Sequence, residues 1–435
     1  MERGMGGASR VLVVLDIGWE STRLKGGFKS GLNGGDELHH KVSVWGGDVR
    51  KFHEFGVRFA VQRFHQWRFG AGDSISEQTQ ADQKLTGRVR YSSYTGDRSR
   101  ASISMEEMVV EALIFGDGKS QVMAAKQVGQ FTRKQRHKIA EKDIIPPLIS
   151  MLHSQDYEAI EASLLALLNL AYGSERNKIL IGRFGAIPVL AMVLQLENES
   201  LCGLAIAALL TLSSCMANKV EIARSGAVEH LLYLLRSQLS AANYMISLDI
   251  ISVLHNLSTC HETVPRIAVS GGGALLLQLI NSWEKSSELV EKATAVLENM
   301  VSSSDAALKE AAETSGCVGV LVEAMEEGSR LCKEYAVGIL LRLCRSCRES
   351  YRGMILREGA MAGLLQLTVD GTATARDTAK ALILLLRDCG GGGQRNPRAQ
   401  AKNVLLEEVM SQIDRGDRAG MSVAVLEEMI AKLRT

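Results

Sequence analysis

Residues 162–190 read ASLLALLNLAYGSERNKILIGRFGAIPVL and contain two phrases that recur along the chain. The first phrase recurs at spacings of 42, 45, 43 and 43 residues, and its leading residues are Asn169, Thr211, Asn256, Asn299 and Arg342. The second phrase is a glycine followed by an apolar run, at spacings of 41, 45, 45 and 43 residues: Gly185, Gly226, Gly271, Gly316 and Gly359. Two markers in step at this period predict an array of stacked helical repeats.

Each repeat is predicted to contain three helices. In the repeat after Asn169 we expect helices at 177–183, 188–196 and 201–213. A glycine ends the first helix at low cost because it adopts the left-handed conformation easily. Proline suits only a first helical turn, which is where Pro146, Pro147 and Pro188 would lie. The third helix is apolar nearly all round, so it must be packed between neighbours.

The composition excludes several classes of protein. A single core stops growing near roughly 250–300 residues, so a chain of 435 residues favours an extended array. The formal net charge of +1 argues against a nucleic-acid partner, which would need a strongly basic surface. No 18-residue apolar run and no secretory signal is present, so we expect no membrane span and a cytoplasmic or nuclear location. All eight cysteines follow residue 200, in runs typical of reduced core thiols.

The chain is predicted to have four segments. Residues 1–104 carry 16 glycines and no sustained period of helix or strand, so we expect a disordered region there. Residues 105–389 hold about six repeats after an irregular start. Residues 390–397 form a glycine-rich linker, and residues 398–435 carry two amphipathic helical segments that cap the last repeat or dock a partner.

Residues 1–104 have two interpretations. They contain Trp19, Trp45, Trp67 and six phenylalanines, which is unusual for a disordered segment and indicates an aromatic interaction tail. Alternatively, translation starts at Met105, where the ordered helical pattern begins. Mass spectrometry of the native protein separates the two, because peptides from before Ser104 would exclude the second interpretation.

Residues 105–389 resemble armadillo repeat domains, particularly those of plant U-box and armadillo-repeat proteins. The phrases that carry the resemblance are Gly185-Ala186-Ile187-Pro188-Val189-Leu190, Asn169-Leu170-Ala171 and Ala379-Lys380-Ala381-Leu382-Ile383-Leu384-Leu385-Leu386. The resemblance implies an all-α, right-handed superhelical solenoid whose third helices line a concave groove. It also implies that one residue per repeat contacts the backbone of a bound peptide: Asn169, Thr211, Asn256, Asn299 and Arg342.

An asparagine side chain suits this role because its amide offers both a donor and an acceptor to a peptide backbone. The alternative is that an asparagine near a helix end satisfies the backbone of the neighbouring turn. Nuclear-import adaptors have tryptophan one turn before each groove asparagine, whereas this chain has Leu165, Ala207, Ser252, Ala295 and Gly338. The resemblance therefore does not extend to basic nuclear-localisation peptides. The Cys-Pro-Ile and Asp-Pro-Val motifs of a U-box are also absent from residues 1–104.

No motif indicates catalysis, a cofactor or a metal ion. Cys344 and Cys347 have metal-ligand spacing, but a structural zinc site commonly needs two such pairs, so we interpret them as packing residues. The glycine runs 271–273 and 390–393 lack the Lys-Ser or Lys-Thr pair of a phosphate loop. The sequence contains no Gly-x-Ser-x-Gly or His-Glu-x-x-His motif. We therefore expect no catalytic residues, no cofactor and no small-molecule substrate.

The sequence predicts a non-enzymatic adaptor or scaffold that holds a segment of a partner protein in an armadillo groove. One alternative is a substrate-recruiting component of ubiquitin transfer, related to U-box ligases but without the U-box. A second alternative is a scaffold that assembles through residues 396–435. The identity of the partner, the oligomeric state and the face that binds are not predicted by the sequence.

Overall fold

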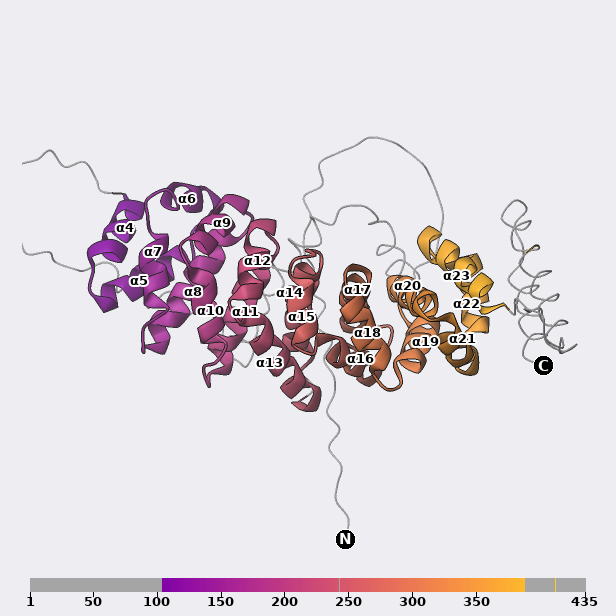
Figure 1. Cartoon of the computed structure of the whole chain (residues 1–435). Helices are drawn as coiled ribbons and strands as arrows, with labels where there is room; N and C mark the ends of the chain where they lie inside the picture. The colour runs from indigo at the N-terminus through magenta and orange to yellow at the C-terminus, as the bar shows by residue number, and fades with distance from the viewer. Residues whose placement is uncertain (1–103, 242, 388–410, 412–435) are drawn as a thin grey trace, which may run out of the picture. The chain divides into compact units, whose positions relative to one another are not determined.

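The computed structural model describes residues 104–241, 243–387 and 411, and these residues form α-helices without strands. Helices α4 (Met105–Phe115) and α5 (Gly118–Val128) precede six groups of three helices (Figure 1). The first helices are α6 (Arg133–Ile139), α9 (Glu175–Arg183), α12 (Met216–Arg224), α15 (Val264–Val269), α18 (Asp305–Glu313) and α21 (Arg348–Arg357). The second helices are α7 (Ile145–Met151), α10 (Ala186–Val193), α13 (Ala227–Ala241), α16 (Gly272–Ser282), α19 (Cys317–Glu327) and α22 (Met361–Asp370). The third helices are α8 (Tyr157–Ala171), α11 (Glu199–Ser213), α14 (Tyr244–Ser258), α17 (Glu288–Ser303), α20 (Arg330–Ser346) and α23 (Ala373–Leu386).

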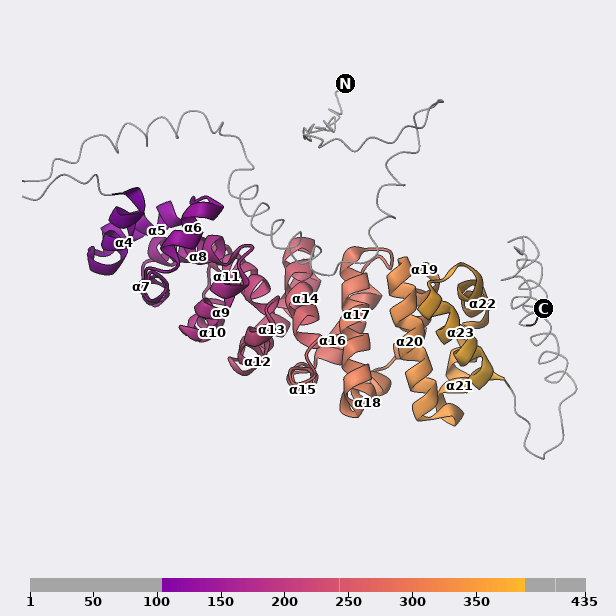
Figure 2. The same ribbon diagram turned by 90° about the horizontal axis from the view of Figure 1, so that it is seen from above.

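Successive third helices form the spine of the array. Each packs directly on the next, from α8 to α23, and α5 packs on α8 at the start. Figure 2 shows α14, α17 and α20 side by side as successive neighbours. The six three-helix repeats and the irregular start therefore form an all-α solenoid, as the repeat period predicted.

Left-handed residues make the turn between the first and second helices. The five predicted glycines all have positive φ, between 75° and 87°: Gly185, Gly226, Gly271, Gly316 and Gly359. In the first repeat Asp143, with φ of 53°, precedes Pro146 by the same three residues that separate Gly185 from Pro188. A side chain with Cβ is strained in this conformation by roughly 1–2 kcal/mol. The glycine marker is therefore a backbone requirement that the first repeat meets with an aspartate.

Every third helix begins with a side-chain cap. A side-chain oxygen of the N-cap residue accepts a hydrogen bond from a backbone N–H of the first helical turn in all six repeats, and the caps are Asp156, Asn198, Asn243, Ser287, Ser329 and Thr372. Such a cap is worth about 1 kcal/mol relative to alanine. The caps fix where each third helix starts, and so align equivalent residues in neighbouring repeats.

The second repeat shows how closely the helices follow the sequence pattern. Its helices α9, α10 and α11 match the predicted ranges within three residues. The largest difference is that α10 ends at Val193 instead of Leu196, because the N–H groups of Gln195 and Leu196 turn back to carbonyls three residues earlier. All residues from Leu204 to Ser213 in α11 are buried, which confirms the packed third helix.

The predicted N-terminal region, the linker at 390–397 and the C-terminal segments lie outside the described residues, apart from Ser104 and Ser411. The boundaries of the four segments therefore stay predictions. Within the described residues, no helix combines the length and the apolar character needed to cross a membrane.

Candidate functional site

The candidate site is one stripe of residues along the third helices, which we call the third-helix face. It consists of the predicted residue of each third helix from α8 to α20 and the residues four and eight positions before it, since residues at this spacing lie on one side of a helix. Its members are Glu161, Leu165, Asn169, Gly203, Ala207, Thr211, Leu248, Ser252, Asn256, Glu291, Ala295, Asn299, Glu334, Gly338 and Arg342. Because neighbouring third helices pack together, the structure brings the five predicted site residues to the same register of successive helices.

The five predicted site residues differ in exposure. Asn169 and Asn299 are half-buried, and Arg342 is exposed. Thr211 and Asn256 are buried, with only 1% and 2% of their surface exposed. The face therefore offers a partner unequal access along its length.

The three asparagines donate hydrogen bonds to the preceding layer. Asn169 Nδ2 donates to the backbone oxygens of Val128 (2.7 Å) and Phe131 (3.0 Å), at the end of α5. Val128 is the last residue of α5, and the final carbonyl groups of a helix have no partners within it. Phe131 lies in the loop that follows α5. Asn169 thus joins α8 to the helix before it.

Asn256 and Asn299 repeat this arrangement in later layers. Asn256 Nδ2 lies 3.0 Å from Ser213 Oγ and 3.5 Å from the backbone oxygen of Leu210, both in α11. Asn299 Nδ2 donates to Ser258 Oγ of α14 at 3.0 Å. Among the described residues, no hydrogen bond is donated to the amide oxygens of Asn169 and Asn299. Because both residues are only half-buried, these oxygens are candidates to accept an N–H from a partner.

Thr211 and Arg342 make different contacts. The Thr211 hydroxyl donates to the backbone oxygen of Ala207 in its own helix at 2.9 Å. The Arg342 Nε lies 3.8 Å from a carboxylate oxygen of Glu298 in α17, and 43% of the Arg342 side chain is exposed. Of the five residues, only Arg342 extends a charged group into solvent.

A second set of contacts, which the sequence analysis missed, caps the ends of the third helices with cations. In the first repeat, Arg136 of α6 donates to the backbone oxygens of Asn169 (2.6 Å) and Tyr172 (3.1 Å). Its guanidinium also lies 5.5 Å from the centre of the Tyr172 ring. A cation at a helix C-terminus is favourable because the helix dipole places partial negative charge there.

The second and third repeats place a lysine at the same position, the fourth residue of the first helix. Lys178 donates to Ser214 Oγ at 2.8 Å, and Lys219 donates to Thr259 Oγ1 at 2.6 Å. Lys219 is 7% exposed, and its burial lowers the pKa of its ammonium group. A buried ammonium that hydrogen-bonds a hydroxyl at a helix C-terminus indicates a structural role.

The sixth repeat keeps this pattern, whereas the fourth and fifth repeats do not. In the sixth repeat, Arg348 and Arg352 of α21 donate to backbone carbonyls at the end of α23. Arg352 lies seven residues before Gly359, as Lys178 and Lys219 do before their turn glycines. At the same register the fourth repeat holds Val264, and the fifth holds Lys309, which pairs with Glu313 instead. The signal was present in the sequence, because Arg136, Lys178 and Lys219 recur in step with the repeat markers.

Charge is uneven along the third-helix face. The stripe on α11 carries Gly203, Ala207 and Thr211, which are all uncharged. On α17 and α20, Glu291 accepts a hydrogen bond from Ser329 Oγ at 2.5 Å and Glu334 accepts one from the hydroxyl of Thr372. The pKa of Tyr335 is raised by its burial and then by nearby Glu291, Glu334 and Glu298. The face is thus neutral in the second repeat and acidic in the fourth, and in the fifth it carries one acidic and one basic residue, Glu334 and Arg342.

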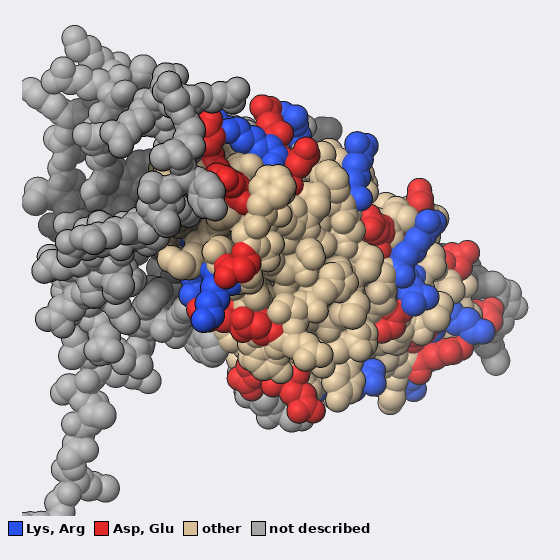
Figure 3. All heavy atoms as spheres, turned by 90° about the vertical axis from the view of Figure 1, so that its left-hand side faces the viewer, with Lys and Arg blue, Asp and Glu red and all other residues tan. Residues whose placement is uncertain are grey.

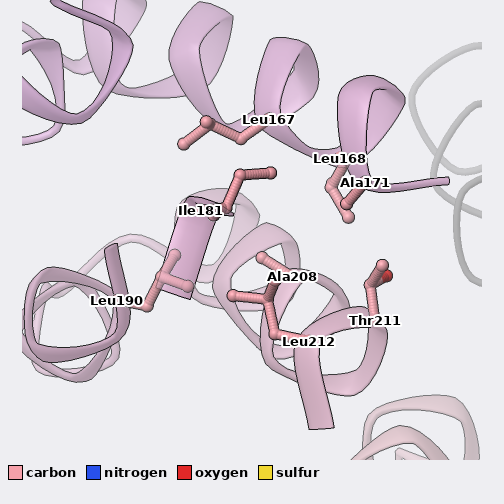
Figure 4. A pocket seen from close by; sticks show the side chains of 8 residues that line it. All are labelled: Leu167, Leu168, Ala171, Ile181, Leu190, Ala208, Thr211 and Leu212. Atoms are coloured by element: carbon pink, nitrogen blue, oxygen red, sulfur yellow. The ribbon is translucent and has the colours of Figure 1, made fainter. Parts of the chain in front are cut away.

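A small apolar cavity lies between α8, α9, α10 and α11 (Figure 4). Its lining side chains are Leu167, Leu168, Ala171, Ile181, Leu190, Ala208, Thr211 and Leu212. The accessible space is about that of one water molecule, and the Thr211 hydroxyl already donates within its own helix. This cavity is a packing gap and offers no polar group to orient a ligand.

The thiols show no arrangement for metal binding. The seven described cysteines are free, and no cluster of three or more His, Cys, Asp or Glu side chains is placed to hold a metal ion in the described residues. Cys344 is buried in α20 and Cys347 is exposed. Hydrogen bonds with Ser350 lower the pKa of the Cys347 thiol. The two cysteines of the Cys-x-x-Cys motif therefore have different environments.

Comparison with known proteins agrees with this architecture. The family model described as "Armadillo/beta-catenin-like repeat" matches residues 132–172, the span from the α6 N-cap to the end of α8. U-box domain-containing protein 45 of Arabidopsis thaliana is 31% identical over 241 residues, which are 55% of this chain and 30% of that protein. U-box domain-containing protein 17 of the same plant is 30% identical over 327 residues, which are 73% of this chain and 43% of that protein. The chain thus spans less than half the length of either relative.

A solved structure supports the same fold. The crystal structure of an engineered protein superimposes with a TM-score of 0.58 at 20% identity, covering 75% of this chain and 76% of the engineered one. At this identity the likeness concerns the fold alone. The described part of this chain is therefore an all-α armadillo-repeat solenoid, and the chain is similar in sequence to U-box domain-containing proteins of Arabidopsis.

Proposed function

We propose that this chain is a non-enzymatic adaptor that holds a segment of a partner protein along the third-helix face. The observation that carries the proposal is the common register of six capped third helices, whose other sides are buried against their neighbours. On the remaining side, Leu165, Ser252 and Gly338 stay partly exposed, whereas Ala207 and Ala295 at the same register are buried. Seven free thiols in the described residues favour a cytoplasmic or nuclear setting for this function.

The predicted site residues have distinct roles in this proposal. Asn169 and Asn299 accept a backbone N–H of the partner through their amide oxygens while their Nδ2 groups hold the preceding repeat. Arg342 offers its guanidinium to an acceptor of the partner. Thr211 and Asn256 are buried, and their side chains make hydrogen bonds within the fold beneath the face. The partner segment thus contacts the same asparagine side chains that hydrogen-bond one repeat to the next.

The test uses glycines on different helices of the array. A Cβ at Gly203 meets nothing within 4 Å, and one at Gly338 meets only the Glu298 side chain at 3.8 Å. Gly203→Trp and Gly338→Trp therefore place bulk on the third-helix face from positions where a Cβ fits. Gly353 in the first helix α21 has the same open space and is exposed. Gly353→Trp is the matched control.

The measurement is selection of displayed peptides on the immobilised full chain, followed by titration of the selected peptides against each variant. We expect Gly203→Trp or Gly338→Trp to weaken binding at least tenfold and Gly353→Trp to leave it unchanged. Thermal melting of each variant checks the fold. Peptides that bind all three variants equally, or that lose binding only with Gly353→Trp, would contradict the third-helix face.

A second candidate function is substrate recruitment in ubiquitin transfer. The observation in its favour is the similarity to proteins named as U-box domain-containing over 55% and 73% of this chain. The test combines the full chain with purified ubiquitin-activating and ubiquitin-conjugating enzymes. Self-modification would support this candidate and contradict a purely non-enzymatic adaptor, whereas no chain formation would leave the adaptor as the function of this chain.

A further inference from the structure

The first helix of the described array has an exposed apolar side. Val109 and Leu113 of α4 are buried, but Met105, Met108 and Phe115 are 51%, 53% and 82% exposed. Figure 3 shows a broad area without charged residues at this end of the array, with charged residues at its rim. Every later layer is covered on this side by the layer before it, whereas no described helix precedes α4. The apolar end therefore lacks the covering that stacked repeats need.

The same helix is acidic. It carries Glu106, Glu107 and Glu111 and no lysine or arginine. Glu107 caps the helix together with Ser104 and lies 3.9 Å from Lys142. Glu111 is exposed and lies three residues after Met108 and four before Phe115, so it shares their side of the helix. A ligand for this surface needs an apolar side that also carries positive charge.

One segment of this chain outside the described residues has this chemistry. Residues 57–68 read VRFAVQRFHQWR and contain three arginines and no acidic residue. Five of their six apolar residues recur at helical spacing: Val57, Ala60, Val61, Phe64 and Trp67. Phe59 is the exception. Thioether groups make favourable contacts with aromatic rings, which suits Phe64 and Trp67 to the exposed methionines of α4. The segment thus matches the surface in both apolar pattern and charge.

The connection between the two is long enough. Residues 69–103 are 35 residues, and a random coil of that length would span roughly 30 Å, whereas the eleven residues of α4 extend over about 16 Å. Because the chain re-enters the described structure at Ser104, directly before Met105, the segment is tethered beside the surface. Tethering of this kind gives an effective concentration on the order of millimolar. Even a weak contact is then populated within one molecule.

We propose that residues 57–68 pack as an amphipathic helix on the apolar side of α4 and cover the N-terminal end of the array. Met105, Met108 and Phe115 receive the apolar residues of the segment, and Glu111 faces its arginines. This contact is separate from the third-helix face and does not depend on the adaptor function.

The test is a disulfide between introduced cysteines in the full chain. Met108→Cys is combined with Phe64→Cys, and the control pair combines Met108→Cys with Ser92→Cys. Ser92 is nearer in sequence, so a loose chain would crosslink the control pair faster. We expect the first pair to form an intramolecular disulfide at least tenfold faster than the control, as measured by peptide mapping under mild oxidation.

Charge reversal gives a second readout that keeps the array intact. Arg63→Glu with Arg68→Glu is expected to slow crosslinking of the first pair about two- to fivefold, the range for exposed ion pairs. Glu111→Arg is expected to restore part of the rate. Equal or slower crosslinking than in the control pair would overturn the proposal. A disulfide between two molecules would also overturn it, because it would assign the surface to a second copy of the chain.

Discussion

Repeats 2 and 5 share one backbone plan but present different chemistry. Their third helices α11 and α20 both start from a side-chain cap and bury an apolar interior. On the third-helix face, α11 carries the half-buried Gly203 and the buried Ala207 and Thr211, with no charge, whereas α20 carries Glu334 and Arg342. The comparison teaches that caps and buried residues set the period of the array. The residues of the third-helix face do not set this period and can differ between repeats. Binding specificity can therefore arise on this face.

Loss of a core leucine should have the largest effect, and the same effect in both repeats. Leu209 and Leu340 lie two residues before the marker residue of their helices, and both are fully buried. Leu209→Ala and Leu340→Ala are each expected to lower the free energy of unfolding by about 2–5 kcal/mol. Urea titration monitored by circular dichroism measures both. If either variant left the free energy of unfolding nearly unchanged, the interiors of the two repeats would differ.

Removing the asparagine that holds the end of α11 should have the next largest effect. Asn256→Ala takes the donor from Ser213 Oγ and the Leu210 carbonyl in a buried place, so we expect a loss of about 1–3 kcal/mol. The end of α20 has no equivalent, because Leu385 stands at this position in the next repeat. Leu385→Asn is the converse variant. If Asn256→Ala left the unfolding free energy unchanged, the inter-repeat role of this side chain would be wrong.

Thiol reactivity should separate the two repeats by about tenfold or more. Burial raises the pKa of Cys202 in α11 to about 11, whereas hydrogen bonds with Ser350 lower the pKa of Cys347 after α20. At pH 8 the lower pKa gives Cys347 the larger thiolate fraction, and its lower nucleophilicity offsets only part of this gain. Iodoacetamide labelling of the native chain followed by peptide mapping gives both rates. Faster labelling of Cys202 would contradict this order.

Glycine replacement on the stripe should stabilise both repeats slightly. Because a Cβ fits at Gly203 and Gly338, Gly203→Ala and Gly338→Ala are each expected to add roughly 0.5–1 kcal/mol to the free energy of unfolding. Differential scanning calorimetry detects this as a small rise in Tm. A fall in Tm would mean that the stripe is packed more tightly than the contacts show.

The smallest effect is expected from the charged residue of repeat 5. Arg342 is exposed and lies 3.8 Å from Glu298, and an exposed pair of this kind contributes about 0–1 kcal/mol. Arg342→Ala should therefore change the unfolding free energy by under roughly 0.5 kcal/mol, and less still in 1 M salt. A loss above about 1 kcal/mol that persists in high salt would assign Arg342 to the fold.

The sequence predicted the array well because its period depends on local chemistry. Glycine turns, proline positions and apolar third helices are each visible in a single repeat, and Gly185 and Pro188 lie where the pattern placed them. The contacts between repeats were harder to predict. Asn169 was placed correctly in the third helix, but its bonds to Val128 and Phe131 depend on how two helices pack. A side chain that faces a groove and one that caps a neighbouring helix look identical in the sequence.

The basic residues of the first helices follow a repeating pattern that was visible in the sequence. Arg136, Lys178 and Lys219 recur at the fourth residue of the first helix, a register as regular as that of the glycines. Their partners at the ends of the third helices depend on tertiary packing, so the sequence could predict the residues but not the contacts. Whether the five marker residues bind a partner stays a prediction, as do the four segment boundaries.

The most direct test of the adaptor proposal is hydrogen–deuterium exchange of the full chain with and without a selected peptide. The account predicts added protection in α8, α11, α14, α17 and α20, centred on peptides that contain Asn169, Asn299 and Gly338, with first and second helices unchanged. Protection confined to the first or second helices, or found only outside residues 104–387, would contradict the third-helix face as the binding surface.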